Sequence, residues 1–187
     1  MGKASTALDD RQVEFLLAQK VFFVATAPAG PGGYVNCSPK GLDSLRVLSP
    51  TRVAWLDFVG SGVETIAHLR ENGRLCLMVC AFEGPPKILR LHGTGRVVEP
   101  ADDGFAALRA HFEPLPDAAL RAILELDVAR VADACGYGVP LMDYVGERAQ
   151  MGAWGEKKGA AGIEQYQRDK NGRSLDGLPG LRWVEPG

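Results

Sequence analysis

The first 40 residues carry one helical and two strand-like hydrophobic patterns. Residues 8–19 place apolar side chains at helical spacing, and acidic residues near their start favour a helix N-terminus through the helix dipole. Residues 21–26 (VFFVAT) are β-branched and aromatic, and a second strand is predicted at residues 34–40. The stretch between them, residues 28–33 (PAGPGG), is typical of a turn. We therefore expect a helix followed by a β-hairpin.

The middle of the chain predicts three more strands and one helix. Residues 53–58 (VAWLDF) predict a strand, and residues 61–72 predict a helix that Gly73 ends. A fourth strand is predicted at residues 75–82, and a fifth at residues 88–98, where apolar and basic side chains alternate. This alternation indicates that one side of the fifth strand faces solvent or a ligand.

Two short helices, at residues 103–111 and 117–124, and a sixth strand at residues 127–134 complete the predicted sheet. The strands follow one another too closely for each to alternate with its own helix, as a doubly wound sheet would require. The pattern therefore favours a mainly β protein, a six-stranded antiparallel barrel with flanking helices.

The composition changes after the sixth strand. Residues 146–187 are rich in Gly, Lys and Asp, which predicts an exposed helix near residues 159–170 and then irregular chain. We expect residues 1–145 to form the barrel domain, and residues 146–187 to pack on that same domain as a C-terminal helix and tail.

The charge of the chain limits its partners. The formal net charge is −2 and the pI is near 5.9, which gives no basic patch for nucleic acid or an anionic membrane. The longest apolar stretch, residues 75–82, is far shorter than the roughly 20 residues that cross a bilayer. Asp9 and Asp10 stand where a secretion signal would be basic and then apolar. We expect a cytoplasmic protein with neither nucleic acid nor membrane as partner.

Cysteine and histidine give no sign of a metal or redox centre. The four cysteines form no CxxC pair and the three histidines form no HxxxH pair, so we interpret the thiols as small buried apolar groups. No nucleophile and base stand in a known order, and no catalytic residue is predicted. A redox site in this chain would need a cofactor, for which the protein supplies position and electrostatics.

The loop at residues 60–65 allows two interpretations. Ser61 and Glu64 have the spacing of a capping box, in which each side chain accepts a hydrogen bond from the other residue's backbone. Gly60 and Gly62 at a helix N-terminus would also allow close approach of a phosphate. Both interpretations stay open on the residues alone.

Polar side chains in two strands allow a similar choice. Asn36, Ser38 and Lys40 share one face of their strand because side chains alternate with a period of two. The fifth strand region adds Lys87 and Arg90. Each set is either a solvated sheet face or part of a site for a shared anionic ligand.

Several stretches of the chain are similar to a known family. They are residues 36–41 (NCSPKG), residues 56–72 (LDFVGSGVETIAHLREN) and residues 87–93 (KILRLHG). Residues 15–140 as a whole resemble the pyridoxamine 5'-phosphate oxidase-like proteins, and residues 135–140 (CGYGVP) resemble an uncharacterised branch rather than the oxidase itself. The resemblance implies a six-stranded antiparallel split β-barrel of the FMN-binding type. It also implies a homodimer with FMN between the subunits.

The resemblance implies a set of cofactor-binding residues. Carried over to this sequence, they are Asn36, Ser38, Lys40, Gly60, Ser61, Gly62, Thr65, Lys87 and Arg90. This chain departs from the oxidase at two points. Residues 61–63 (SGV) stand where the oxidase has a Ser-Arg-Lys phosphate clamp, and Ile88 stands where it has a glutamine. Pyridoxamine phosphate is therefore not the substrate we expect.

The resemblance implies an FMN-dependent oxidoreductase that acts on an unknown small molecule. One alternative is a protein that holds a flavin or haem without turnover, for storage or sensing. Another is a reductase that uses the deazaflavin F420, and FAD also stays open as the cofactor.

Overall fold

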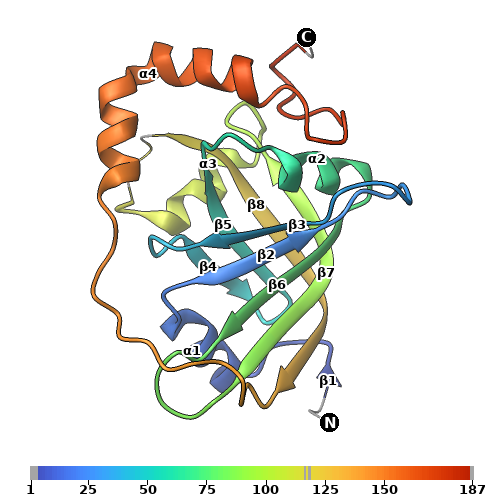
Figure 1. Ribbon diagram of the computed structural model, residues 1–187, viewed down its shortest axis with the longest axis vertical. Helices are drawn as coiled ribbons and strands as arrows, with labels where there is room; N and C mark the ends of the chain where they lie inside the picture. Colours follow the sequence, from blue (N-terminus) through green and yellow to red (C-terminus); the bar gives the residue numbers. More distant parts are fainter. Residues whose placement is uncertain (1–3, 116, 118, 186–187) are drawn as a thin grey trace.

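The computed structural model describes residues 4–115, 117 and 119–185. A curled antiparallel sheet forms the body of the molecule, with helix α1 (Asp10–Ala18) at one end and helix α2 (Glu64–Glu71) at the other (Figure 1). α1 begins with a capping box: the Asp9 carboxylate accepts from the Gln12 backbone N–H at 2.8 Å, and the Gln12 side chain accepts from the Asp9 N–H at 3.1 Å. The predicted first helix is confirmed.

In the described part of the chain, seven strands follow one another across the sheet in the order β3-β2-β6-β7-β8-β5-β4, one more than the predicted six. The two-residue strand β1 (Ala4–Ser5) pairs with β8. All neighbouring pairs are antiparallel, as the pattern predicts. The bounds are β2 Phe22–Thr26, β3 Asn36–Lys40, β4 Leu45–Ser49, β5 Arg52–Phe58, β6 Arg74–Cys80, β7 Ile88–Val98 and β8 Leu120–Ala134.

The additional strand, β4, lies at an edge of the sheet and pairs with β5. Leu45 is its one buried residue, and the other four residues are half-buried. Such a strand gives almost no alternation of buried and exposed positions, which is why the hydrophobic pattern did not reveal it.

The last strand, β8, begins earlier than predicted. We expected a helix at residues 117–124, but β8 already begins at Leu120; residues 116 and 118 lie outside the described part of the chain. The sequence LRAILEL favours a helix by intrinsic propensity. β8 instead pairs with β5 on one side and β7 on the other, and a second core cluster around Phe112 and Ile123 covers its other face. Tertiary packing therefore outweighs local propensity.

The sheet curls far enough for its distant strands to meet. Lys40 at the end of β3 forms a salt bridge with Asp57 of β5 at 3.2 Å, although four strands lie between β3 and β5 in the hydrogen-bonded order. The main core fills the interior of this half-barrel, with Trp55 fully buried and packed edge-on against Phe22 at 6.1 Å between ring centroids. The predicted mainly β fold with flanking helices is confirmed as a split barrel of seven strands.

The remaining helices lie outside the sheet. α3 (Phe105–Arg109) and a 3-10 turn (Ala110–Phe112) confirm the predicted helix after β7, and Gly73 follows α2 with φ +68°. α4 (Gln150–Lys170) begins nine residues earlier than predicted. It bends at Gly159, whose φ of 63° and ψ of 171° interrupt the helix, and the two halves form an elbow (Figure 1).

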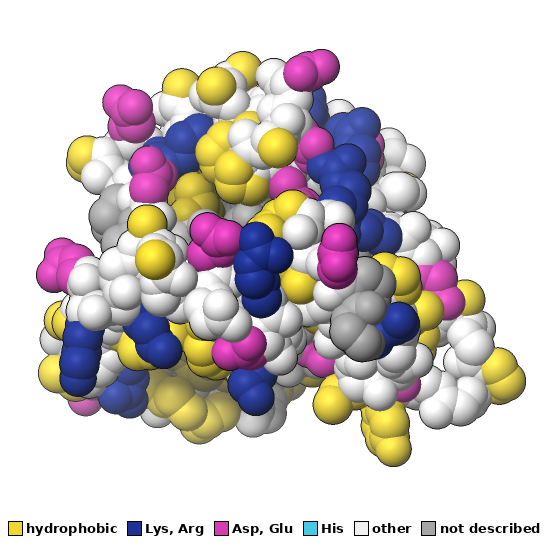
Figure 2. Space-filling model, turned by 90° about the horizontal axis from the view of Figure 1, so that it is seen from above, with side chains coloured by type: hydrophobic (Ala, Val, Ile, Leu, Met, Phe, Trp, Pro, Cys, Tyr) yellow, Lys and Arg dark blue, Asp and Glu magenta, His cyan; other side chains and the backbone are white. Residues whose placement is uncertain are grey.

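Two segments of the C-terminal part follow very different courses. Residues 141–148, here called the strap, are exposed at every position and run along the outside of the barrel from β8 towards α4 (Figure 1). Residues 171–184, here called the tail, fold back over the end of the barrel, where Leu181 and Val184 join the main core. Seen from this end, basic and acidic side chains alternate around a hydrophobic patch (Figure 2). The division into two parts at residue 145 stays a prediction.

Candidate functional site

The inner side of β3 carries the polar side chains that the sequence singled out. Asn36, Ser38 and Lys40 are half-buried, whereas Cys37 and Pro39 between them are exposed, so the predicted shared face exists. It is directed into the barrel and is not a freely solvated surface. Ser38 Oγ is buried and has no hydrogen-bond partner within the described part of the chain.

Asn36 joins β3 to two neighbouring elements. Its Nδ2 atom donates to Thr26 Oγ1 of β2 at 3.1 Å and to Thr65 Oγ1 of α2 at 3.0 Å. Both N–H bonds of the amide are thereby used. The Oδ1 atom accepts no hydrogen bond from the residues that the structure describes, so it remains available to a ligand that carries an N–H or O–H donor.

His68 and Asp176 fix the direction of these hydrogen bonds. The His68 ring is fully buried, with Nε2 at 3.5 Å from Asp176 Oδ2 and Nδ1 at 2.9 Å from Thr26 Oγ1. Nε2 makes no hydrogen bond to a described residue, but the tautomer with its hydrogen on Nε2 directs that hydrogen towards the Asp176 carboxylate and leaves Nδ1 to accept from the Thr26 hydroxyl. The hydroxyl oxygen of Thr26 is then the acceptor that Asn36 needs. Neither His68 nor Asp176 was predicted from the sequence as a site residue.

Lys40 belongs to a buried charge cluster. It shares the Asp57 carboxylate with Arg121 of β8, whose Nε and Nη2 atoms lie 2.9 and 2.8 Å from Asp57 Oδ2. Burial alone would raise the pKa of Asp57, but the charges of Arg121 and Lys40 together hold it below its usual value. Asp57 and Arg121 were not predicted, although a charged residue inside an apolar strand is a signal that it has a partner.

The loop before α2 corrects the predicted capping box. Ser61 is exposed and makes no cap; Val63 is the N-cap residue, and no side chain caps this helix. Arg121 Nη1 instead donates to Gly62 O at 2.8 Å and so anchors the loop to the charge cluster. Glu64 turns back beside Gly62, where its carboxylate lies at the start of the helix. The N–H groups of residues 60–62 donate to no described residue.

The tail closes this end of the barrel. Asn171 Nδ2 donates to Gly60 O at 3.0 Å, and Glu64 Oε1 accepts from Leu175 N at 3.3 Å. Asp176 accepts from Tyr34 N at 3.1 Å, so the tail also reaches the turn before β3. The polar end of the barrel is therefore assembled from β2, β3, α2 and the tail together.

Comparison with known sequences decides the family. The sequence profile of the family described as pyridoxamine 5'-phosphate oxidase matches residues 8–135. The chain belongs to the pyridoxamine 5'-phosphate oxidase family. A relative from Aspergillus flavus, the pyridoxamine 5'-phosphate oxidase family protein ustO, is 41% identical over 190 residues, which cover 94% of this chain and 76% of that protein.

Solved structures of this family share the fold. A Lactobacillus delbrueckii protein named as a candidate pyridoxamine 5'-phosphate oxidase matches with a TM-score of 0.53 and 22% identity, over 68% of this chain and 94% of that one. The HupZ protein of Group A Streptococcus matches with a TM-score of 0.54 and 18% identity, over 72% of this chain and 100% of that one. At these identities the likeness shows the split-barrel fold alone.

The family site residues predicted from sequence do not all come together. Seven of them gather at the polar end: Asn36, Ser38, Lys40, Gly60, Ser61, Gly62 and Thr65. Lys87 lies apart from them, with its Nζ 3.5 Å from Asp133 and 4.6 Å from the centre of the Phe15 ring. Arg90 pairs across the sheet with Met78 and Ala132, three strands from β3. Within one copy of the chain the two basic residues are not part of this cluster.

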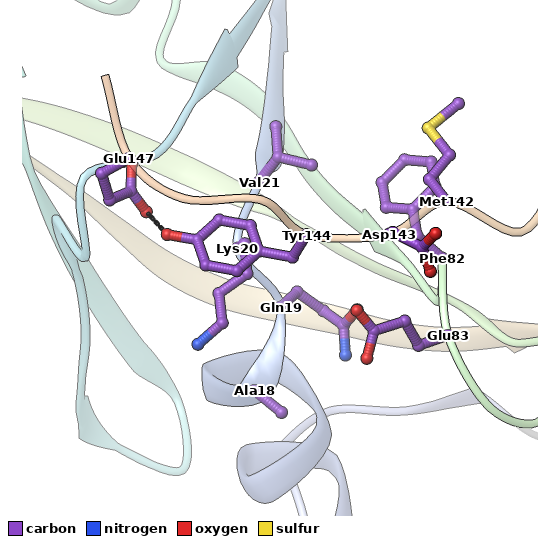
Figure 3. Close-up of a pocket in the computed structure, with 10 residues that line it drawn as sticks. All are labelled: Ala18, Gln19, Lys20, Val21, Phe82, Glu83, Met142, Asp143, Tyr144 and Glu147. Atoms are coloured by element: carbon purple, nitrogen blue, oxygen red, sulfur yellow. Dashed lines mark hydrogen bonds between the residues drawn. The ribbon is translucent and has the colours of Figure 1, made fainter.

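A second hollow lies at the other end of β2. It has a volume of about 460 Å³ and is formed by the end of α1, the connection from α1 to β2, the β6–β7 turn and the strap. Figure 3 shows Tyr144, Lys20 and Glu147 on one side of it and Phe82, Met142 and Glu83 on the other. Its lining shares no residue with the polar end of the barrel.

The residues at the polar end suit the ring of a flavin better than its phosphate. The unpartnered Ser38 hydroxyl and the free Asn36 Oδ1 suit the carbonyl and N–H groups of a flavin ring. A phosphate would be attracted less strongly. Lys40 and Arg121 both pair with Asp57, and Glu64 adds a negative charge at the start of α2. The described residues thus fit the polar ring and chain of a flavin, with a weak place for its phosphate at residues 60–62.

Proposed function

We propose that this chain binds a flavin, FMN, at the polar end of its barrel and serves as an oxidoreductase for a small molecule. The observation that carries the proposal is the buried Ser38 Oγ, which no described residue satisfies, beside an Asn36 amide that three other side chains hold in one orientation. A buried hydroxyl without a partner costs free energy, so a ligand that bonds to it gains affinity. Membership of the pyridoxamine 5'-phosphate oxidase family supports a flavin as that ligand.

When bound, the flavin supplies hydride transfer, and the protein supplies position and electrostatics. Asn36 Oδ1 would accept from a ring N–H, and Ser38 Oγ would donate to a neighbouring carbonyl. The N–H groups at residues 60–62 and the net single positive charge of Lys40, Arg121 and Asp57 would hold the phosphate.

The first test is uptake of the cofactor by the purified protein. We expect FMN to bind with a flavin absorption band and quenched fluorescence, and riboflavin to bind almost as well because the phosphate site is weak. If the protein binds neither FMN nor riboflavin, the proposal is wrong. Competition with FAD, F420 and haem identifies the cofactor if one of these displaces FMN.

Ser38→Ala tests the residue that carries the proposal. Loss of one neutral hydrogen bond of about 0.5–1.5 kcal/mol predicts flavin binding roughly 2–10-fold weaker. The same change leaves the stability of the flavin-free protein equal or higher, because the hydroxyl has no partner there. Ser49→Ala on the edge strand β4 is the matched control, and an equal loss of affinity in both variants would contradict the assignment.

Turnover separates an oxidoreductase from a protein that only holds a flavin. Under anaerobic conditions, NADH or NADPH should bleach the bound flavin at a rate that supports catalysis. Bleaching no faster than that of free FMN would favour the binding protein instead.

The proposal includes a homodimer with the flavin between two copies, and a cytoplasmic location. Large apolar side chains beside β3 support the dimer, since Tyr34 is 67% exposed and Val35 74% exposed in a single chain. Sedimentation should give a dimer, and Val35→Asp should dissociate it and weaken flavin binding. A monomer that binds flavin tightly would remove the shared groove. No helix in the described part of the chain has the length and apolar content needed to cross a bilayer.

A further inference from the structure

The hollow beneath the strap is separate from the proposed flavin site. Val21, immediately before β2, lines the hollow, whereas Thr26 at the end of β2 belongs to the polar network, a separation of roughly 17 Å at about 3.3 Å per residue. The two places therefore belong to opposite ends of the barrel (Figure 1). What occupies one does not touch the other within a single chain.

The hollow stays open because few contacts hold the strap against the barrel. Met142 N donates to Phe82 O at 3.0 Å, and Tyr144 lies over Lys20, whose Nζ is 5.6 Å from the ring centre. The apolar side chains that the strap contributes are not covered by this chain, since Met142 is 54% and Tyr144 46% exposed. A volume of about 460 Å³ is within the range of pockets that hold small molecules, about 300–1,000 Å³.

The lining of the hollow favours positive charge. Glu83, Asp143 and Glu147 contribute three carboxylates, and Lys20 is the one cationic side chain among the lining residues. Figure 3 shows the Glu147 carboxylate hydrogen-bonded to the Tyr144 hydroxyl, and Glu83 on the opposite side of the hollow. The net formal charge of the lining is −2, which repels anions and attracts cations.

Tyr144 gives the hollow an aromatic wall with a fixed position. Its hydroxyl donates to Glu147 Oε1 at 2.9 Å, and this hydrogen bond, followed by desolvation and the Glu147 charge, raises the pKa of the Tyr144 phenol. The ring therefore stays neutral, and its face attracts cations, as the position of Lys20 Nζ over it shows. Phe82 and Met142 complete the apolar lining.

We propose that the hollow between the strap and the α1–β2 corner is a second ligand site, which takes an organic cation: an amine whose apolar body lies against Phe82, Met142 and Tyr144. The ammonium group takes the place near the Tyr144 face and the carboxylates of Asp143 and Glu147. This site does not depend on the flavin proposal.

Three probes with one body and different charges test the site. They are 4-phenylbutylamine, 4-phenylbutanol and 4-phenylbutanoate, titrated into the isotopically labelled full chain and followed by NMR. We expect the amine to shift the signals of Lys20, Phe82 and Tyr144, the alcohol to shift them at higher concentration, and the carboxylate to leave them unchanged. Equal or tighter binding of the carboxylate, or absence of amine shifts at millimolar concentration, overturns the proposal.

Matched variants test which side chains of the hollow bind the amine. Glu147→Gln keeps the acceptor for Tyr144 but removes one negative charge, and we expect about 3–10-fold weaker amine binding with the alcohol unchanged. Tyr144→Leu should weaken amine binding about 2–5-fold through loss of the cation–π contact. Glu156→Gln, an exposed change on α4 outside the hollow, should alter neither.

Two further outcomes are decisive. If Tyr144→Leu dissociates a dimer and the amine never binds, the hollow is a contact between copies and the proposal is wrong. If the amine shifts the same residues with and without FMN present, the ligand site stands whatever the fate of the flavin proposal.

Discussion

The two ends of the barrel differ in how their polar groups are satisfied. At the α2 end, Asn36, His68 and Asp57 are partnered by residues from distant parts of the chain, and the tail covers them. At the α1 end, the strap leaves a hollow whose carboxylates and apolar side chains face water. The first end is preorganised by the fold itself, whereas the second gains its partners only from a ligand or another molecule. Substitutions of the partnered groups at the first end should therefore reduce stability, whereas substitutions in the hollow at the second end should change ligand binding alone.

The largest effect is expected for Arg121→Met. It leaves the fully buried Asp57 with Lys40 alone and frees the Gly62 carbonyl. Removing one partner of a buried ion pair costs about 3–5 kcal/mol, which urea unfolding would measure. Glu164→Gln, at the exposed ion pair with Arg168, is the control and should cost about 0–1 kcal/mol. Similar losses in both variants would mean that the buried cluster has no special role.

The pH dependence of stability follows from the same carboxylate. Because the folded pKa of Asp57 is depressed, its contribution is present above the unfolded value of about 3.9 and is lost as the pH falls towards the folded pKa. The free energy of unfolding should therefore decrease below about pH 4. Asp57→Asn should flatten this part of the profile, and an unchanged acid slope in that variant would contradict the assignment.

Thr26→Val should have an intermediate effect. It removes the hydroxyl between His68 and Asn36 and leaves buried donors and acceptors without partners, at a cost of about 1–3 kcal/mol. Thr94→Val, an exposed position on β7, is the control. If both variants unfold at the same urea concentration, the polar network contributes nothing to stability.

The smallest effect is expected for Glu64→Gln. Loss of a negative charge at the start of α2 should tighten FMN binding by about 0.3–1 kcal/mol, while Gln keeps an acceptor for Leu175 N. Riboflavin, which lacks the phosphate, should bind with unchanged affinity. Glu71→Gln at the other end of the same helix is the control, and a gain for riboflavin equal to that for FMN would place the flavin phosphate elsewhere.

Local patterns predicted much of the fold, and long-range contacts account for what they missed. The span of β7 and the end of α2 at Gly73 follow from alternation and from glycine at a C-terminus. The start of β8 was missed because its partners β5 and β7, and the cover from Phe112, are absent from any local window. β4 has too little alternation to be detected.

The candidate site was predicted only in part, for a similar reason. The shared face of Asn36, Ser38 and Lys40 follows from the period of a strand. Asp57 and Arg121 are 64 residues apart, and one sequence does not reveal which distant residues pair. The available signal was a charged side chain, Asp57, within the predicted apolar strand at residues 53–58, whereas Arg121 fell in a predicted helix. Ser61 and Glu64 had the spacing of a capping box, but Arg121, Leu175 and the bent loop made other bonds more favourable.

The tail also bears on the order of events during folding. Its hydrogen bonds from Asn171 to Gly60 and from Leu175 to Glu64 each span 111 residues, whereas β6 and β7 meet across a short turn. Long-range contacts form slowly because loop closure must precede them. In pulsed hydrogen exchange during refolding, the amides of Leu77 and Leu91 should gain protection before that of Leu181. The polar end would then be the last part of the barrel to become native.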